Sequence, residues 1–183
     1  MTQVIRDRAG AGEVEPGEME LGEVWTRLQL VEHRLRRALA ARHAEDPELD
    51  DPYRGLYLTP EAVQRILDTR SPSSTSGVSY GPAPSQDTRL GQLVTRFGLI
   101  PLDIELLVIA MAPDIDARFE RLYGYLNDDV TQRRPTVGLA LELCGMPAAG
   151  YGRFRCGQAA PLVAGGLVEV CEPERPLLSR SLR

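Results

Sequence analysis

The sequence lacks lysine altogether, because all 21 basic residues are arginine. This absence excludes mechanisms that need a lysine amine, such as Schiff-base chemistry or phosphate binding by a phosphate-loop lysine. The chain also lacks a G-x-x-x-x-G-K-[ST] loop, so nothing would cradle a nucleotide phosphate. We therefore expect no catalytic residues, no bound cofactor and no enzymatic activity in this chain.

Aromatic residues are scarce, at 5% of the sequence, although 43% of the residues are hydrophobic. Leucine, valine and alanine must therefore form most of the core. The formal net charge is -5, whereas a domain built to grip nucleic acid usually carries a basic surplus that neutralises phosphates. The length allows one domain, or one domain plus a helical extension.

Metal-binding and export signals are also missing. The cysteines Cys144, Cys156 and Cys171 form no C-x-x-C pair, so the sequence predicts neither a zinc site nor a disulfide set. His33 and His43 lack partners at ligand spacing, and we expect no metal. No apolar segment approaches the ~20 residues that span a bilayer, and no signal core begins the chain. We expect a cytoplasmic protein that makes no contact with membranes.

The N-terminal part divides into a tail and a helix. Residues 1–19 are rich in Gly, Glu and Arg and have no periodicity, which predicts a disordered tail. From Leu21 to about Arg42, apolar residues recur at steps of three and four, which predicts a long amphipathic helix. The apolar seam includes Leu28, Val31 and Leu35. This seam either lies on the chain's own domain or docks on a partner or a second copy.

An acidic, proline-containing connector follows this helix at residues 45–52. A short helix is predicted after it, because Thr59 suits an N-cap and Pro60 suits the first helical position. We assign residues 20–70 to an N-terminal helical segment. Residues 71–87 consist largely of Ser, Gly and Pro, which predicts a flexible linker.

Residues 88–183 form the dense part of the chain. A helix around residues 90–97 ends at Gly98, and a strongly apolar helix, Leu102–Met111, begins after Pro101 and ends at Pro113. Asp114 or Asp116 is expected to cap the next helix. Thr136 is the expected N-cap of an apolar helix over residues 137–144.

The hydrophobic pattern of the last residues changes from a helical to a strand-like period. Residues 167–170 alternate like a strand, and residues 177–182 follow a proline-containing turn as a second strand. Helices followed by a hairpin describe a winged helix. The fold class expected is mainly α with a small β-hairpin: a winged-helix-like domain, residues 88–183, preceded by a long amphipathic helix. The chain would stop where a larger protein continues.

A basic cluster with aromatic neighbours lies in this domain, formed by Arg118, Arg121, Arg133 and Arg134. In a DNA-binding winged helix such a patch could contact phosphates. Alternatively, Arg118 and Arg121 pair with Asp114, Glu120 or the Asp128–Asp129 acids on the same helical hairpin. We favour pairing, because the net charge is negative and the presumptive recognition helix, residues 137–144, is apolar.

Four segments resemble a known protein group: Leu93–Leu99, Glu105–Asp116, Leu122–Asp129 and Arg134–Ala140. They are similar to the winged-helix region that precedes the ATPase module of bacterial AAA+ ATPases associated with phage-tail-like contractile injection systems. Residues 51–58 also resemble the preceding stretch in those proteins. The resemblance covers about residues 50–183.

The resemblance implies a non-catalytic N-terminal accessory module that mediates protein–protein interaction, by partner or substrate recruitment or by ring assembly. The implied partners are another protein or a second copy, and a downstream AAA+ domain that would bind ATP and Mg²⁺. The candidate interaction surface is either the helical seam or the arginine cluster. The alternative function is that of a DNA-binding winged-helix transcriptional regulator.

Overall fold

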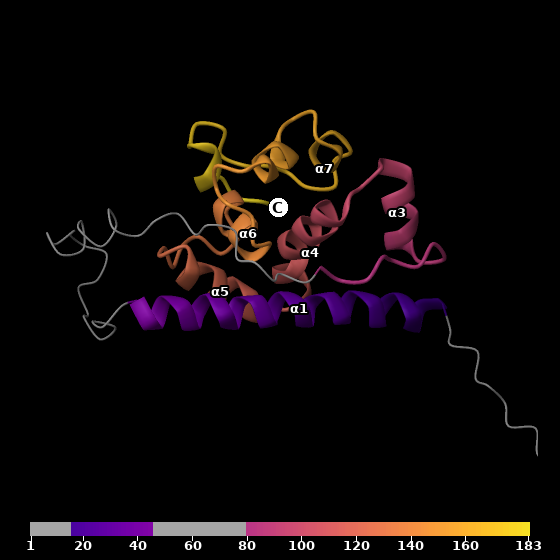
Figure 1. Cartoon of the computed structure of the whole chain (residues 1–183), viewed down its shortest axis with the longest axis horizontal. Helices are drawn as coiled ribbons and strands as arrows, with labels where there is room; N and C mark the ends of the chain where they lie inside the picture. Colours follow the sequence, from indigo (N-terminus) through magenta and orange to yellow (C-terminus); the bar gives the residue numbers. More distant parts are fainter. Residues whose placement is uncertain (1–15, 46–79) are drawn as a thin grey trace, which may run out of the picture.

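A computed structural model describes residues 16–45 and 80–183. The predictions for residues 1–15, for the acidic connector, for the short helix after Thr59 and for residues 71–79 lie outside the described residues. Figure 1 shows a long helix along one side of a compact helical body, with the C-terminal segments on the opposite side. None of the described helices combines the length and apolarity needed to cross a bilayer.

The first helix, α1, runs over Pro16–Glu45. It matches the amphipathic pattern, but it begins earlier than expected, so residues 16–19 are helical rather than part of a loose tail. A proline suits the first turn of a helix, where its missing N–H is not needed. One face of α1 packs on α4, α5 and α6, and the helix shares a single hydrophobic core with the later part of the chain.

Two helices with the expected caps lie beyond residue 80. In α3, Arg89–Phe97, the Thr88 hydroxyl accepts a hydrogen bond from the Gly91 N–H. Gly98 then ends the helix at φ 62°, a left-handed conformation that glycine adopts without strain. In α6, Val137–Leu143, the Thr136 hydroxyl accepts from the Leu139 N–H, which confirms the predicted N-cap.

The central helix, α4, spans Pro101–Ile115 and continues through Pro113, where the sequence predicted its end. A proline inside a helix leaves the carbonyl four residues earlier without its N–H donor. That carbonyl belongs to Ile109, and the buried Tyr123 hydroxyl donates a hydrogen bond to it at 2.9 Å. Tyr123 lies on the next helix, α5, Arg118–Leu126, so a side chain from α5 supplies the missing donor.

The C-terminal residues form short elements: η1, Tyr151–Cys156; α7, Pro161–Ala164; and η2, Leu177–Ser179. The predicted β-hairpin is not confirmed, because no strand occurs among residues 16–45 and 80–183. The last residues instead form isolated antiparallel bridges, Val170 with Leu182 and Thr136 with Ser181. Leu177–Ser179 adopt a helical turn, and Pro135 has no N–H with which to extend a ladder.

Candidate interaction surface

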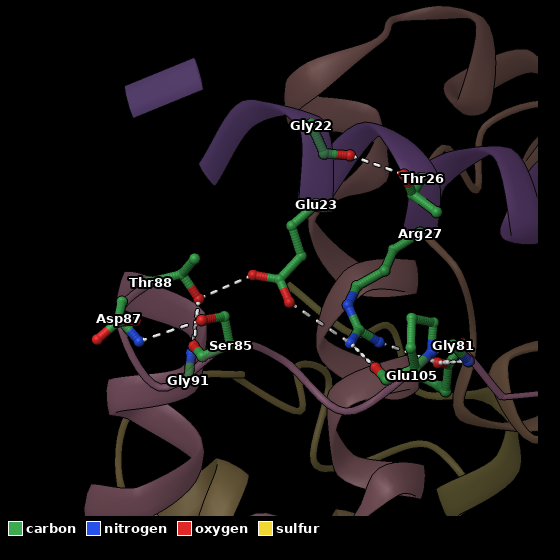
Figure 2. A network of polar contacts seen from close by, with 11 residues as sticks. Gly22, Glu23, Thr26, Arg27, Gly81, Ser85, Asp87, Thr88, Gly91 and Glu105 are labelled. Carbon is green, nitrogen blue, oxygen red and sulfur yellow. Dashed lines mark hydrogen bonds and ion pairs between the residues drawn. The ribbon is translucent and has the colours of Figure 1, made fainter. Parts of the chain in front are cut away.

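Two arginines of α1, Arg27 and Arg34, point into the protein, which the sequence did not predict. Arg27 and Arg34 are 2% and 6% exposed. Both pair with Glu105 of α4, one on each carboxylate oxygen: Arg34 at 2.6 Å, and Arg27 at 3.4 Å, as Figure 2 shows. An acid within a strongly apolar helix is a usable signal, because a buried charge needs a partner. The two arginines directly precede seam leucines.

The network extends to the residues before α3 (Figure 2). The Gly81 N–H donates to Glu105 at 3.1 Å, and Arg27 donates to the Pro82 carbonyl. Thr88 donates through its hydroxyl to Glu23 of α1 at 2.8 Å. Residues 80–88 are therefore fastened to α1, although composition predicted a flexible linker as far as residue 87. Composition could not show that backbone groups here would bind buried charges.

The apolar seam of α1 faces the chain's own core. Leu28, Val31 and Leu35 are 3%, 0% and 1% exposed. Of the two arrangements that the sequence left open, the structure contains the intramolecular one. We therefore correct the candidate interaction surface: these three side chains are packed in the core by α4, α5 and α6, so the seam itself is not free to dock, and Leu35 reaches only the floor of a groove.

A groove of about 620 Å³ lies between α1 and α5, and we call it the α1–α5 groove. Its apolar lining comes from Leu35 and Leu39 of α1 and from Phe119 and Leu122 of α5. Leu39 and Leu122 are half-buried, so they contribute apolar surface that residues 16–45 and 80–183 leave uncovered. A volume of roughly 300–1,000 Å³ is typical of ligand sites.

Arginines line the edges of the α1–α5 groove. Arg36 and Arg118 are exposed and share Glu32, at 2.5 Å and 3.8 Å. Arg118 also pairs with Asp116 at 2.7 Å, and this hydrogen-bonded contact lowers the pKa of the Asp116 carboxyl. Arg121 is exposed and has no acidic partner among the described residues. The groove thus combines an apolar floor with a basic edge.

A second hollow of about 480 Å³ lies on the other side of α5 and shares Arg121 with the first. Tyr125 and Val130 line it, and they are 41% and 84% exposed. Arg133 pairs there with Glu120 at 3.5 Å. Arg121 therefore lies between two partly apolar hollows, and α5 is the element that presents this surface.

Residues 18–183 match the model of a domain family described as winged helix domain, variant. The chain belongs to this winged helix family. No curated protein and no solved structure matches it.

The apolar helix of this winged helix domain, α6, lies inside the molecule. Val137, Leu139 and Leu141 are 0–4% exposed, and α6 contacts α1, α4, η1 and η2. Its sequence, VGLALEL, contains one charged residue, Glu142, which pairs with Arg42 of α1 at 3.3 Å. This helix presents no basic side chain.

The remaining arginine of the predicted cluster is engaged within the winged helix domain. Arg134 makes a two-pronged contact with Asp114, at 2.6 Å for each nitrogen–oxygen pair. These hydrogen bonds hold the pKa of Asp114 below its ordinary value. Asp114 therefore anchors Arg134, while Asp116 accepts from the Arg118 N–H at the start of α5 at 2.9 Å. The structure brings Arg118 and Arg121 together at one groove and leaves Arg133 and Arg134 outside it.

Two of the three cysteines lie in the interior of the protein. Cys144 and Cys156 are buried, and burial raises their pKa values to about 12 and about 11. Both thiols therefore stay protonated at neutral pH. Among the described residues, no group of three or more potential ligands could hold a metal ion.

Proposed function

We propose that this winged helix domain is a non-catalytic protein-interaction module, and that α5 is its recognition element. The observation that carries the proposal is the α1–α5 groove. Its floor is apolar, and its edge includes Arg121, which has no acidic partner among the described residues. Exposed apolar surface with a polar rim is typical of protein interaction sites.

The alternative, a DNA-binding regulator, has less support. DNA-binding winged helices place a helix in the major groove, where its side chains reach base edges. Here α6 is enclosed and carries Glu142 as its only charge. Arg133 and Arg134 pair with acids on the same surface, so phosphate contacts would have to replace existing ion pairs.

The finer part of the proposal is that the module belongs to an AAA+ ATPase of a contractile injection system. Its support is the resemblance of residues 50–183 to the accessory region of such proteins. The gene downstream of the codon for Arg183 tests it directly. A phosphate-loop motif within the next hundred or so codons is the expected result, and its absence there would reject the ATPase assignment.

Activity of the chain itself is tested by calorimetry with ATP and Mg²⁺. Because the chain has no lysine and no phosphate loop, we expect no binding and no hydrolysis. Measurable ATP affinity would contradict the assignment of a non-catalytic role.

Photo-crosslinking in cells that naturally produce the chain tests the interaction role. A photoreactive amino acid at Val130, which is 84% exposed beside α5, should crosslink to a protein. The control carries the same photoreactive amino acid in place of Glu174, in the exposed turn before η2. Duplex DNA binding with affinity that falls steeply as salt rises would instead favour the regulator.

A further inference from the structure

The α1–α5 groove has a local charge opposite to that of the whole chain. Three arginines and one glutamate line it, whereas the formal net charge of the chain is -5. Glu32 is already shared by Arg36 and Arg118, and Asp116 also pairs with Arg118, so Arg121 is the arginine without an acid among the described residues. The edge therefore keeps an excess of positive charge, and this excess is centred on α5.

The shape of the groove matches a helical ligand. Its two walls are helices, and the uncovered apolar side chains, Leu39 and Leu122, come from opposite walls. An amphipathic helix that lies in such a groove places side chains spaced three or four residues apart on the floor. Residues beside that apolar stripe then face the edges, where Arg118 and Arg121 lie.

We propose that the α1–α5 groove binds an amphipathic helix of a partner protein that carries acidic residues beside its apolar stripe. This inference rests on the proposed interaction function and names the chemistry of the partner. Apolar side chains of the partner cover Leu39 and Leu122, and its carboxylates pair with Arg121 and Arg118. Charge complementarity of this kind selects partners and speeds their encounter.

Fluorescence anisotropy with two designed peptides tests the inference on the full chain. Each peptide has about 18 residues, or about five helical turns, with leucines on one face. One carries glutamates beside the leucines, and the other carries lysines in their place. We expect the acidic peptide to bind at least tenfold more tightly, and its affinity to fall as salt rises.

A matched pair of variants locates the binding site. Arg121→Glu should weaken the acidic peptide at least tenfold. Arg153→Glu changes the net charge equally, but it lies on η1, where the arginine is exposed and contacts the Phe154 ring, and it should leave affinity unchanged. Equal urea midpoints for both variants and the parent chain would show that folding is preserved.

Several results would overturn the inference. Equal affinity for the two peptides would show that the groove does not select acidic partners. Binding of neither peptide would show that the groove does not bind an amphipathic helix. Equal losses of peptide affinity in the Arg121→Glu and Arg153→Glu variants would place the peptide contact outside the groove. A dimer that dissociates with Leu122→Glu, as seen by sedimentation, would assign the groove to a second copy. If no peptide binds but Val130 still crosslinks to a protein, this inference fails while the proposed function stands.

Discussion

The helix α1 uses arginine in two different ways on its two sides. On the side facing α4, Arg27 and Arg34 are enclosed and share the carboxylate of Glu105. On the side facing α5, Arg36 is 73% exposed and pairs with Glu32 at the edge of an open groove. The same residue type serves as a buried anchor in one place and as part of an accessible surface in the other.

The difference lies in what the opposite helix supplies. Helix α4 offers a buried carboxylate and a continuous apolar face, so α1 closes against it. Helix α5 places Phe119 in the core, but its arginines lie outside the core, and the α1–α5 groove remains open between the two helices. A buried ion pair is strongly disrupted by loss of one partner, whereas an exposed pair contributes little. The two sides should therefore respond very differently to mutation.

The largest effect is expected on the α4 side. Glu105→Ala would remove the carboxylate that the two buried guanidinium groups share, and would leave Arg27 the longer contact with Glu23 at 3.9 Å. It should lower the free energy of unfolding by about 3–5 kcal/mol. Urea denaturation measures this change. The matched control is Glu169→Ala, which removes an exposed pair with Arg183 at 2.8 Å and should cost no more than about 1 kcal/mol.

A triple variant separates the cost of unpaired charge from the value of the pair itself. Arg27→Met, Arg34→Met and Glu105→Leu together should restore much of the stability, because an apolar replacement of a buried ion pair is often neutral or stabilising. A triple variant as unstable as Glu105→Ala would show that the charges are needed for packing α1.

Two leucines of α1 should also differ in how much their substitution lowers the free energy of unfolding. Leu28 is 3% exposed in the core, so Leu28→Ala should cost about 2–5 kcal/mol. Leu39 lines the groove and is only half-buried, so Leu39→Ala should cost clearly less. Equal losses in urea denaturation would mean that the groove is closed in solution.

An intermediate effect is expected where α5 meets α4. Tyr123→Phe removes the hydroxyl that donates to the Ile109 carbonyl, and it should cost about 1–3 kcal/mol because that carbonyl stays buried and unpaired. In the background of Pro113→Ala, which restores a backbone N–H to the helix, the same substitution should cost less. A double-mutant cycle measures this coupling, and additive losses would contradict the compensation.

The smallest effect is expected on the open side. Arg118→Ala removes a contact with Asp116 whose arginine is 69% exposed, and the urea midpoint should stay that of the parent chain. Its effect should instead appear as weaker binding of the acidic peptide. A lowered midpoint would show that Arg118 fastens α5 to α1 rather than facing a partner.

Much of the local structure could be read from the sequence. The spacing of Leu28, Val31 and Leu35 predicted the face of α1, and Thr136 and Gly98 marked helix ends through cap chemistry that depends on neighbouring residues alone. The helix end predicted at Pro113 was wrong, because the Tyr123 hydroxyl, ten residues farther along the chain, replaces the hydrogen-bond donor that the proline lacks. The expected hairpin was reduced to isolated bridges for a similar reason: its last residues also bond to residues 135–137.

The candidate site was only half predictable. Arg118 and Arg121 were found as part of a basic cluster, but the cluster also contained Arg134, which the fold joins to Asp114, 20 residues earlier in the chain. Leu39 was not considered, because its role depends on a facing helix nearly eighty residues away. No local pattern specifies which acids meet which arginines across such distances.

The sequence by itself determined the positions of most longer helices, the caps at Gly98 and Thr136, the absence of lysine chemistry and the amphipathic face of α1, since these follow from residue types and spacing. The tertiary structure decided which arginines are buried and which remain accessible. That choice depends on where α4 and α5 place carboxylates and apolar side chains against α1. Burial makes Arg27 and Arg34 dependent on Glu105, whereas Arg121 stays in solvent beside an apolar groove.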